Sequence, residues 1–95
     1  MSCYVYMLRS LKNPTYYVGI SNNVERRLAE HNRGKLKNTS KNKPYEIVFR
    51  KEHADYFVAR KHEVWLKKKS LGYKNKLANI FLDTQREGRE REGPT

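Results

Sequence analysis

Two tyrosines in neighbouring predicted strands, Tyr6 and Tyr17, are the first side chains whose type and spacing could do chemistry. Alternate side chains of a strand share a face, so Tyr6 points away from Val5 and Tyr17 points the same way as Gly19. If the strands pair in register as a hairpin, both phenols project from one side of the sheet and Gly19 leaves room beside them. On propensity alone, two strand tyrosines that only pack their rings would be the more common arrangement.

Arg27 and His31 are four residues apart on one face of a predicted helix, beside the apolar positions Val24 and Leu28. The planar guanidinium of Arg27 could bind a phosphate through a fork of hydrogen bonds. The alternative is a solvated side chain that extends past Leu28. His31 on its own would more often be a hydrogen-bonded surface residue.

Glu63 is an almost isolated acid in a basic stretch of a predicted long helix. Ala59 and Leu66 neighbour it at helical spacing, so the carboxylate lies beside the apolar face. It is either a salt-bridge partner or the ligand of a hard cation such as Mg²⁺, whose other ligands would be phosphate oxygens and water. From the helix pattern alone, the salt bridge is the more common of the two.

The elements that must position these residues are predicted to form an α+β domain in the order β-β-α-β-α-α, a three-stranded antiparallel sheet with flanking helices. We expect strands at Tyr4–Leu8, Tyr16–Ile20 and Pro44–Phe49, and helices at Val24–Asn32, Asp55–Lys69 and Lys74–Leu82. The polar, basic segment Arg33–Lys43 is expected to be a loop.

Local signals refine this outline. Asn22, with Glu25 three residues later, has the spacing of a capping box at the start of the first helix. In the long helix, Val58, Trp65 and Leu66 are expected on or near one apolar stripe.

One domain over residues 1–83 is expected. Residues 84–95 form a charged tail that should be disordered or a frayed extension of the last helix.

Charge is the strongest feature of the composition. The 95 residues carry 21 lysines and arginines against 10 acids, a formal net charge of +11. Three arginines and three glutamates cancel within residues 84–95, so the whole excess lies on residues 1–83. A compact body this positive repels itself unless it meets a polyanion, and nucleic acid is the most common one. A basic surface without a ligand is the alternative.

Several classes of protein are excluded. The single cysteine, Cys3, rules out an internal disulfide and a multi-cysteine zinc site. The pair His62-Glu63 lacks the second histidine of a zinc-protease helix, and there is no glycine-rich phosphate loop. No apolar run is long enough to span a membrane and no signal peptide is recognisable, so we expect a reduced, soluble, cytoplasmic protein.

The order of these residues resembles the GIY-YIG nuclease superfamily over roughly residues 3–80. Tyr4-Val5-Tyr6 and Tyr17-Val18-Gly19 resemble the two triplets that name the superfamily, with Tyr4 in place of its first glycine. The chain is most similar to the small stand-alone bacterial members made of this domain only.

Four further positions carry the resemblance. Arg27 matches the helix arginine of the family, and His31 fills the position four residues further on. Glu63 matches the metal-binding glutamate of the long helix, and Asn75 matches a polar residue that some members carry.

The resemblance implies an endonuclease that hydrolyses phosphodiester bonds in DNA with Mg²⁺ or Mn²⁺, acting on structures such as flaps, branches or nicks in repair or recombination. Glu63 would hold the cation, and Arg27 would offset the charge that grows on the phosphate. Tyr17 would take a proton from the attacking water, with Tyr6 or His31 orienting or relaying it. Because a free phenol has a pKa of about 10, nearby positive charge would have to favour the phenolate.

One departure keeps a second function open. Ile20 follows Gly19 where several nuclease members carry a lysine thought to help deprotonate the tyrosine. Either His31 replaces that lysine, or the chain is a non-catalytic module that binds DNA or RNA with the same fold.

In both cases we expect a monomer with no small-molecule cofactor and no membrane contact. The residues expected to follow the nucleic-acid backbone are Lys35, Lys37, Lys41, Lys43, Lys67, Lys68, Lys69 and Asn75.

Overall fold

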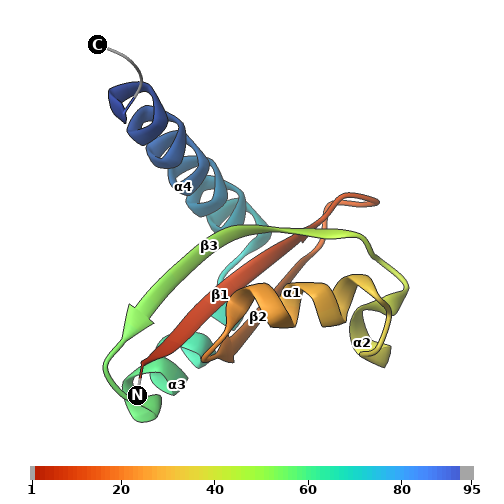
Figure 1. Ribbon diagram of the computed structural model, residues 1–95. Helices are drawn as coiled ribbons and strands as arrows, with labels where there is room; N and C mark the ends of the chain where they lie inside the picture. The colour runs from red at the N-terminus through yellow and green to blue at the C-terminus, as the bar shows by residue number, and fades with distance from the viewer. Residues whose placement is uncertain (1, 93–95) are drawn as a thin grey trace.

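The computed structural model describes residues 2–92 and shows a single sheet with helices packed against it (Figure 1). In chain order the elements are β1 (Cys3–Ser10), β2 (Tyr16–Ser21), α1 (Val24–Asn32), α2 (Lys37–Ser40), β3 (Tyr45–His53), α3 (Tyr56–Lys67) and α4 (Leu71–Glu92). The strands are antiparallel and lie in the order β2-β1-β3. The α+β fold predicted from the sequence, a three-stranded antiparallel sheet with flanking helices, is confirmed.

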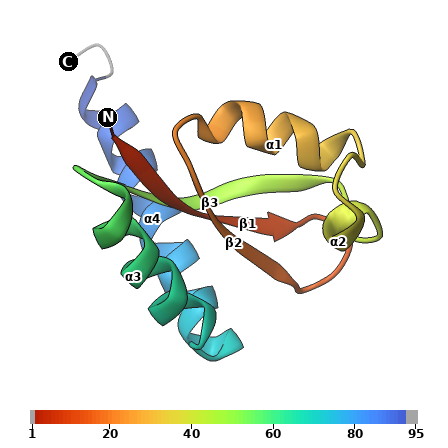
Figure 2. The same ribbon diagram turned by 90° about the horizontal axis from the view of Figure 1, so that it is seen from below.

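Helices cover both faces of the sheet. α1 lies over one face, and α3 and the start of α4 lie over the other (Figure 2). Because side chains alternate along a strand, Val5 and Met7 of β1 point toward α3 and α4, whereas Tyr6 and Leu8 point toward α1. All four are fully buried, since β1 is the central strand and has a helix on each side. We call the two sides the α1 face and the α3/α4 face.

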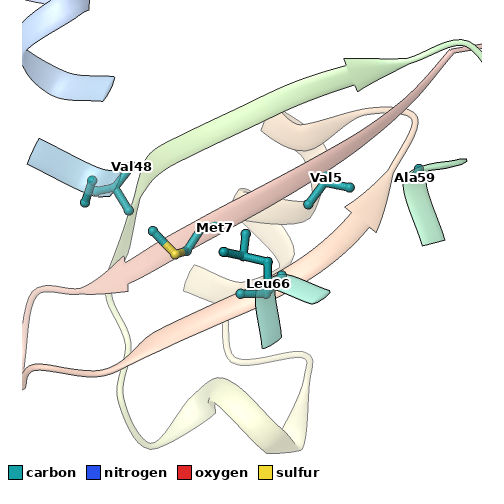
Figure 3. Close-up of a cluster of buried hydrophobic side chains, with 7 residues drawn as sticks. Val5, Met7, Val48, Ala59 and Leu66 are labelled. Atoms are coloured by element: carbon teal, nitrogen blue, oxygen red, sulfur yellow. The ribbon is translucent and has the colours of Figure 1, made fainter. Parts of the chain in front are cut away.

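The larger apolar cluster fills the space between the sheet and the α3/α4 layer (Figure 3). Its buried members are Val5, Met7, Val18, Val48, Ala59, Leu66 and Ala78. The α1 face is covered by a smaller cluster that includes two tyrosines and is therefore part apolar and part hydrogen-bonded. This division places the polar chemistry of the protein on the α1 face.

A β-bulge in β3 adds a side chain to the larger cluster. Met7 pairs with Phe49 and Leu8 with Ile47, so Val48 is an extra residue in the ladder. In a regular strand Val48 and Phe49 would point to opposite faces, but here both pack in the cluster of the α3/α4 face. The bulge thus strengthens the core where α4 contacts β3.

The N-cap of α1 differs by one residue from the prediction. Asn23, not Asn22, is the cap: its backbone is extended, with φ −148°, and its side chain accepts a hydrogen bond from the amide of Arg26. The amide of Asn23 itself donates to the hydroxyl of Ser21. Two adjacent asparagines offer the same acceptor, and this contact with Ser21 favours the second.

The helical regions also differ from the prediction. Residues Lys37–Ser40 of the expected loop form α2. In α3, Val58 and Trp65 are 48% and 46% exposed, so the predicted apolar stripe is wrong for two of its three residues. The buried positions are Ala59, Glu63 and Leu66, which lie at helical spacing on one face of α3.

The last strand and the last helix are longer than expected. β3 continues to His53 instead of ending at Phe49. α4 begins at Leu71 and runs to Glu92, so up to that residue the tail has the form of a helix extension. Residues 93–95 of the predicted tail lie outside the described part of the chain, and the domain boundary after residue 83 stays a prediction. Within residues 2–92, no helix combines the length and the apolar character needed to cross a membrane.

The two glycines Gly19 and Gly72 provide a matched test of packing. A Cβ added at Gly19 would lie 2.7 Å from Oη of the buried Tyr6, whereas one added at Gly72 would meet only Ser70 Oγ, at 3.9 Å. We expect Gly19→Ala to lower the free energy of unfolding by about 1–3 kcal/mol through overpacking. Gly72→Ala, in a helix, should leave it unchanged or raise it by up to about 1 kcal/mol. Denaturant unfolding of both variants measures this, and equal stabilities would contradict the assigned packing.

Candidate active site

Tyr6 lies at the centre of the α1 face, over a position without a side chain. In the β1–β2 ladder Tyr6 is opposite Gly19, and its ring is fully buried. The hydroxyl and the adjacent ring carbon occupy the space where a Cβ of residue 19 would lie, at 2.7 and 2.8 Å from that position. The predicted room beside Gly19 is therefore present, and the Tyr6 ring fills it.

Tyr17 lies diagonally next to Tyr6 on the same face. It pairs with Leu8, two positions along the ladder from the Tyr6–Gly19 pair, and its ring centroid is 6.2 Å from that of Tyr6. The imidazole of His31 lies against it, with 4.5 Å between ring centroids. The expectation that both phenols project from one side of the sheet is thus met. Tyr17 is only half-buried, so of the two phenols it is the one open to a ligand.

His31 joins the tyrosines from the last turn of α1 and is fully buried. Its Nε2 is 3.4 Å from the hydroxyl of Tyr6, and its Nδ1 is 2.8 Å from Oγ1 of Thr39. The Thr39 hydroxyl donates its single proton to the carbonyl of Leu36, so Oγ1 accepts from Nδ1–H of His31. In this tautomer Nε2 is an acceptor and receives the hydroxyl proton of Tyr6.

Thr39 is a residue of the site that the sequence did not reveal. It is 2% exposed and belongs to α2, in the segment expected to be a loop. α2 is fixed by distant contacts: the hydroxyl of Tyr45 donates to the carbonyl of Thr39, and Ser10 donates to the carbonyl of Asn42. No local periodicity carries that information. In the sequence, Thr39 is one polar residue within a polar, basic segment, and nothing there indicates that it is buried.

The guanidinium of Arg27, on α1, acts on the pKa of the same hydroxyl. It is half-buried and forms an ion pair with Glu30, with 2.7 Å between Nη1 and Oε1. Burial raises the pKa of Tyr6, and the Arg27 guanidinium beside it only partly offsets that effect. Positive charge therefore does not make Tyr6 a phenolate. Tyr6 keeps its proton and acts as a donor.

The imidazole of His31 is kept neutral by its surroundings. Burial lowers its pKa below the ordinary value of 6.5, and the charge of Arg27 lowers the pKa further. The site thus combines a neutral phenol, a neutral imidazole whose Nε2 accepts a hydrogen bond from that phenol, and a guanidinium.

Glu63 approaches this group from α3, on the other face of the sheet. It is 6% exposed, and its charge contributes to the raised pKa of Tyr6. Its two carboxylate oxygens are taken up by Arg60, at 2.5 Å, and by Lys67, at 3.3 Å. The structure thus brings Tyr6, Tyr17, Arg27 and His31 into one cluster and places Glu63 within electrostatic reach of it. In this structure Glu63 is a salt-bridge partner, the more common of the two roles expected from the helix pattern.

Glu63 can hold a divalent cation only with help from a ligand. Within residues 2–92, no three histidine, cysteine, aspartate or glutamate side chains gather as a metal cluster. One buried carboxylate fits the Mg²⁺ arrangement in which substrate phosphates and waters supply the other oxygens.

The residues predicted to contact nucleic acid lie in two groups, one in and beside α2 and one around the junction of α3 and α4. Lys35, Lys37, Lys41, Lys43, Lys67, Lys68 and Asn75 are exposed, and Lys69 is half-buried. Asn75 accepts a 2.5 Å hydrogen bond from the hydroxyl of Tyr16, next to Tyr17 in β2. This contact places the junction between α3 and α4 at the edge of the sheet where the tyrosine cluster lies.

The buried histidines predict how stability depends on pH. The pKa values of His31 and His62 are both lowered by burial, so near pH 6.5 the unfolded chain binds more protons than the folded one. Stability therefore falls as the pH drops from about 7.5 to about 5.5. The pKa values of Glu25 and Glu30 are also lowered, but they affect the free energy of unfolding only near and below pH 4.5, outside this range. Urea unfolding across this range measures the effect, which should shrink in His31→Gln. Constant stability would contradict neutral buried histidines.

The chain matches the GIY-YIG catalytic domain over residues 2–77. It is also similar to the solution NMR structure of the UPF0213 protein BH0048 from Bacillus halodurans, with 28% identity and a TM-score of 0.53. That similarity covers 84% of this chain and 85% of the other. No curated protein matches the chain. Since the domain match includes every member of the tyrosine cluster and Glu63, the protein belongs to the GIY-YIG family of nuclease domains.

Proposed function

We propose that this protein is a metal-dependent endonuclease that hydrolyses phosphodiester bonds in DNA with Mg²⁺ or Mn²⁺. The observation that carries the proposal is the cluster on the α1 face, where Tyr17 and His31 lie 4.5 Å apart beside a guanidinium. The net charge of +11 supports a polyanionic substrate.

Tyr17, as the phenolate, is the group that would take the proton of the attacking water and become a neutral phenol. It is the half-buried phenol of the pair, whereas Tyr6 is fully buried and its raised pKa keeps it protonated. His31 contacts the rings of both tyrosines and offers Nε2 as an acceptor, so it can orient or relay the proton. In several family members a lysine at the position of Ile20 is thought to help deprotonate the tyrosine, and here His31 would take over that role.

Arg27 and Glu63 serve the phosphate. The half-buried guanidinium of Arg27 offsets the negative charge that grows on the phosphate oxygens as the P–O bond breaks. Glu63 would hold the divalent cation, which supplies polarisation of a phosphate oxygen and stabilisation of the leaving oxygen. Arg60 and Lys67, which now bind the carboxylate, are free to pair with substrate phosphates once the cation is in place.

A second candidate function is a nucleic-acid-binding module without turnover. Ile20 favours it, because an aliphatic side chain cannot assist deprotonation of the neighbouring tyrosine. The cluster of Tyr17, His31 and Arg27 favours the enzyme, since binding alone does not need a buried imidazole that is hydrogen-bonded to a tyrosine hydroxyl beside a guanidinium.

A cleavage assay on flapped, branched, nicked and linear DNA distinguishes the two functions. We expect cleavage with Mg²⁺ and none with chelator. Tyr17→Phe, Glu63→Gln and Arg27→Ala should each lower the rate by about a hundredfold or more. The matched controls are Tyr16→Phe and Arg26→Ala, because Tyr16 bonds to Asn75 on the other face and Arg26 is exposed. Both controls should cleave like the wild type. Binding without cleavage on every substrate would establish the module instead.

The hydrogen bond from His31 to Thr39 predicts a measurable tautomer. Imidazole ¹⁵N chemical shifts should show His31 protonated at Nδ1, because Thr39 Oγ1 accepts there. Thr39→Val removes that acceptor and should mix the tautomers and lower kcat by about two- to tenfold, the effect of one hydrogen bond. Thr39→Ser should restore both. An imidazole protonated at Nε2 in the wild type would contradict the assignment of Nδ1 as the donor to Thr39 and of Nε2 as the acceptor from Tyr6.

A further inference from the structure

Two half-exposed aromatic rings meet at the junction between α3 and α4. Trp65 of α3 is 46% exposed and Tyr73 of α4 is 38% exposed. Their planes are perpendicular, with 5.6 Å between the ring centroids. Nζ of Lys69 lies over both rings, 4.3 Å from the centroid of Trp65 and 5.7 Å from that of Tyr73. We call these three residues the junction platform.

The indole is held in place from the protein side. Trp65 contacts His62, with 6.0 Å between ring centroids, and His62 contacts Phe49 at the same distance. Phe49 in turn packs against the core cluster of the α3/α4 face. One side of the Trp65 indole is therefore fixed by contacts with the protein, and the other side is exposed to solvent. An exposed aromatic surface of this kind is typical of a binding site.

Positive charge surrounds the platform. The neighbours of Trp65 at helical spacing are Lys61, His62, Lys68 and Lys69, and residues 64–82 contain no acid but five lysines. A flat apolar surface framed by cations fits a ligand that combines a planar ring with a phosphate. An apolar protein partner would leave these ammonium groups desolvated and unpaired.

The helix that carries Tyr73 also contacts the edge strand that carries Tyr17. Asn75, two residues after Tyr73, accepts the hydroxyl proton of Tyr16, and Tyr16 precedes Tyr17 in β2. A strand bound at Tyr17 would pass around this edge strand to reach the platform on the other face. Lys67, which pairs with Glu63, lies on the same stretch of α3.

We propose that the junction platform stacks an unpaired base of a single-stranded segment of the substrate. The proposal rests on nucleic acid being the substrate and adds to it that part of the strand is unpaired. The base stacks on the indole, and the ammonium of Lys69 moves from the ring to a neighbouring phosphate. A base in a duplex cannot do this, because its faces are already covered by its neighbours in the stack.

Trp65 is the only tryptophan of the chain, so its fluorescence reports the contact directly. In chelator, which prevents cleavage, we expect a single-stranded DNA of about ten nucleotides to quench the emission. An abasic strand of the same length has the same charge but nothing to stack, and it should bind without quenching.

Variants separate stacking from charge. By anisotropy of labelled DNA, Trp65→Ala should weaken binding of the single strand about tenfold and leave binding of the abasic strand and of duplex unchanged. Phe57→Ala is the matched control, because Phe57 is 77% exposed on the first turn of the same helix, and it should change none of the three. Circular dichroism checks that both variants are folded.

Three results would overturn the proposal. They are equal quenching by abasic and normal strands, equal loss of affinity for all three DNAs in Trp65→Ala, and quenching by anionic lipid vesicles but not by DNA. These are binding measurements, so they do not depend on whether the protein cleaves. If the DNA stacks on Trp65 but is never cleaved, only the proposed hydrolysis is contradicted, and the stacking proposal stands.

Discussion

The site depends on the absence of a side chain at Gly19. The buried Tyr6 ring occupies the space that a Cβ there would fill. In this position its hydroxyl lies over β2, within hydrogen-bond distance of His31 and beside the charge of Arg27. A larger residue would push the ring toward α1, and the imidazole in the last turn of that helix would lose its partner. The pairing of Tyr6 with Gly19 thus fixes the register of β1 and β2 and also determines where the Tyr6 hydroxyl and its proton lie.

Burial works against charge throughout this site. The protein carries a formal net charge of +11, yet the pKa of Tyr6 is raised, because removal from water outweighs the guanidinium beside it. The same burial keeps His31 neutral. A proton-accepting imidazole can therefore persist inside a strongly basic protein. The positive charge lies mainly on exposed lysines, where it serves the attraction of a polyanion.

Much of this arrangement could be predicted from the sequence, because short-range rules govern it. Strand alternation placed Tyr6 and Tyr17 on one face, and the spacing of four residues placed Arg27 and His31 together. The contribution of Thr39 could not be predicted, since α2 is held by hydrogen bonds to residues six to thirty-two positions away. The orientation of α3 was also missed. The sequence favours an apolar stripe that contains Trp65, but α3 buries Ala59, Glu63 and Leu66 instead and leaves the indole half-exposed.

The ion pairs of Glu63 have a consequence for the order of events at the site. Both carboxylate oxygens have cationic partners, Arg60 and Lys67, so a metal ion at the proposed site would compete with two tethered positive charges. A phosphate backbone would relieve that competition, because it would offer both side chains another anion and bring oxygens for the metal. In the proposed function, loading of the metal would then be coupled to arrival of the strand, and the apparent metal affinity would be a property of the complex.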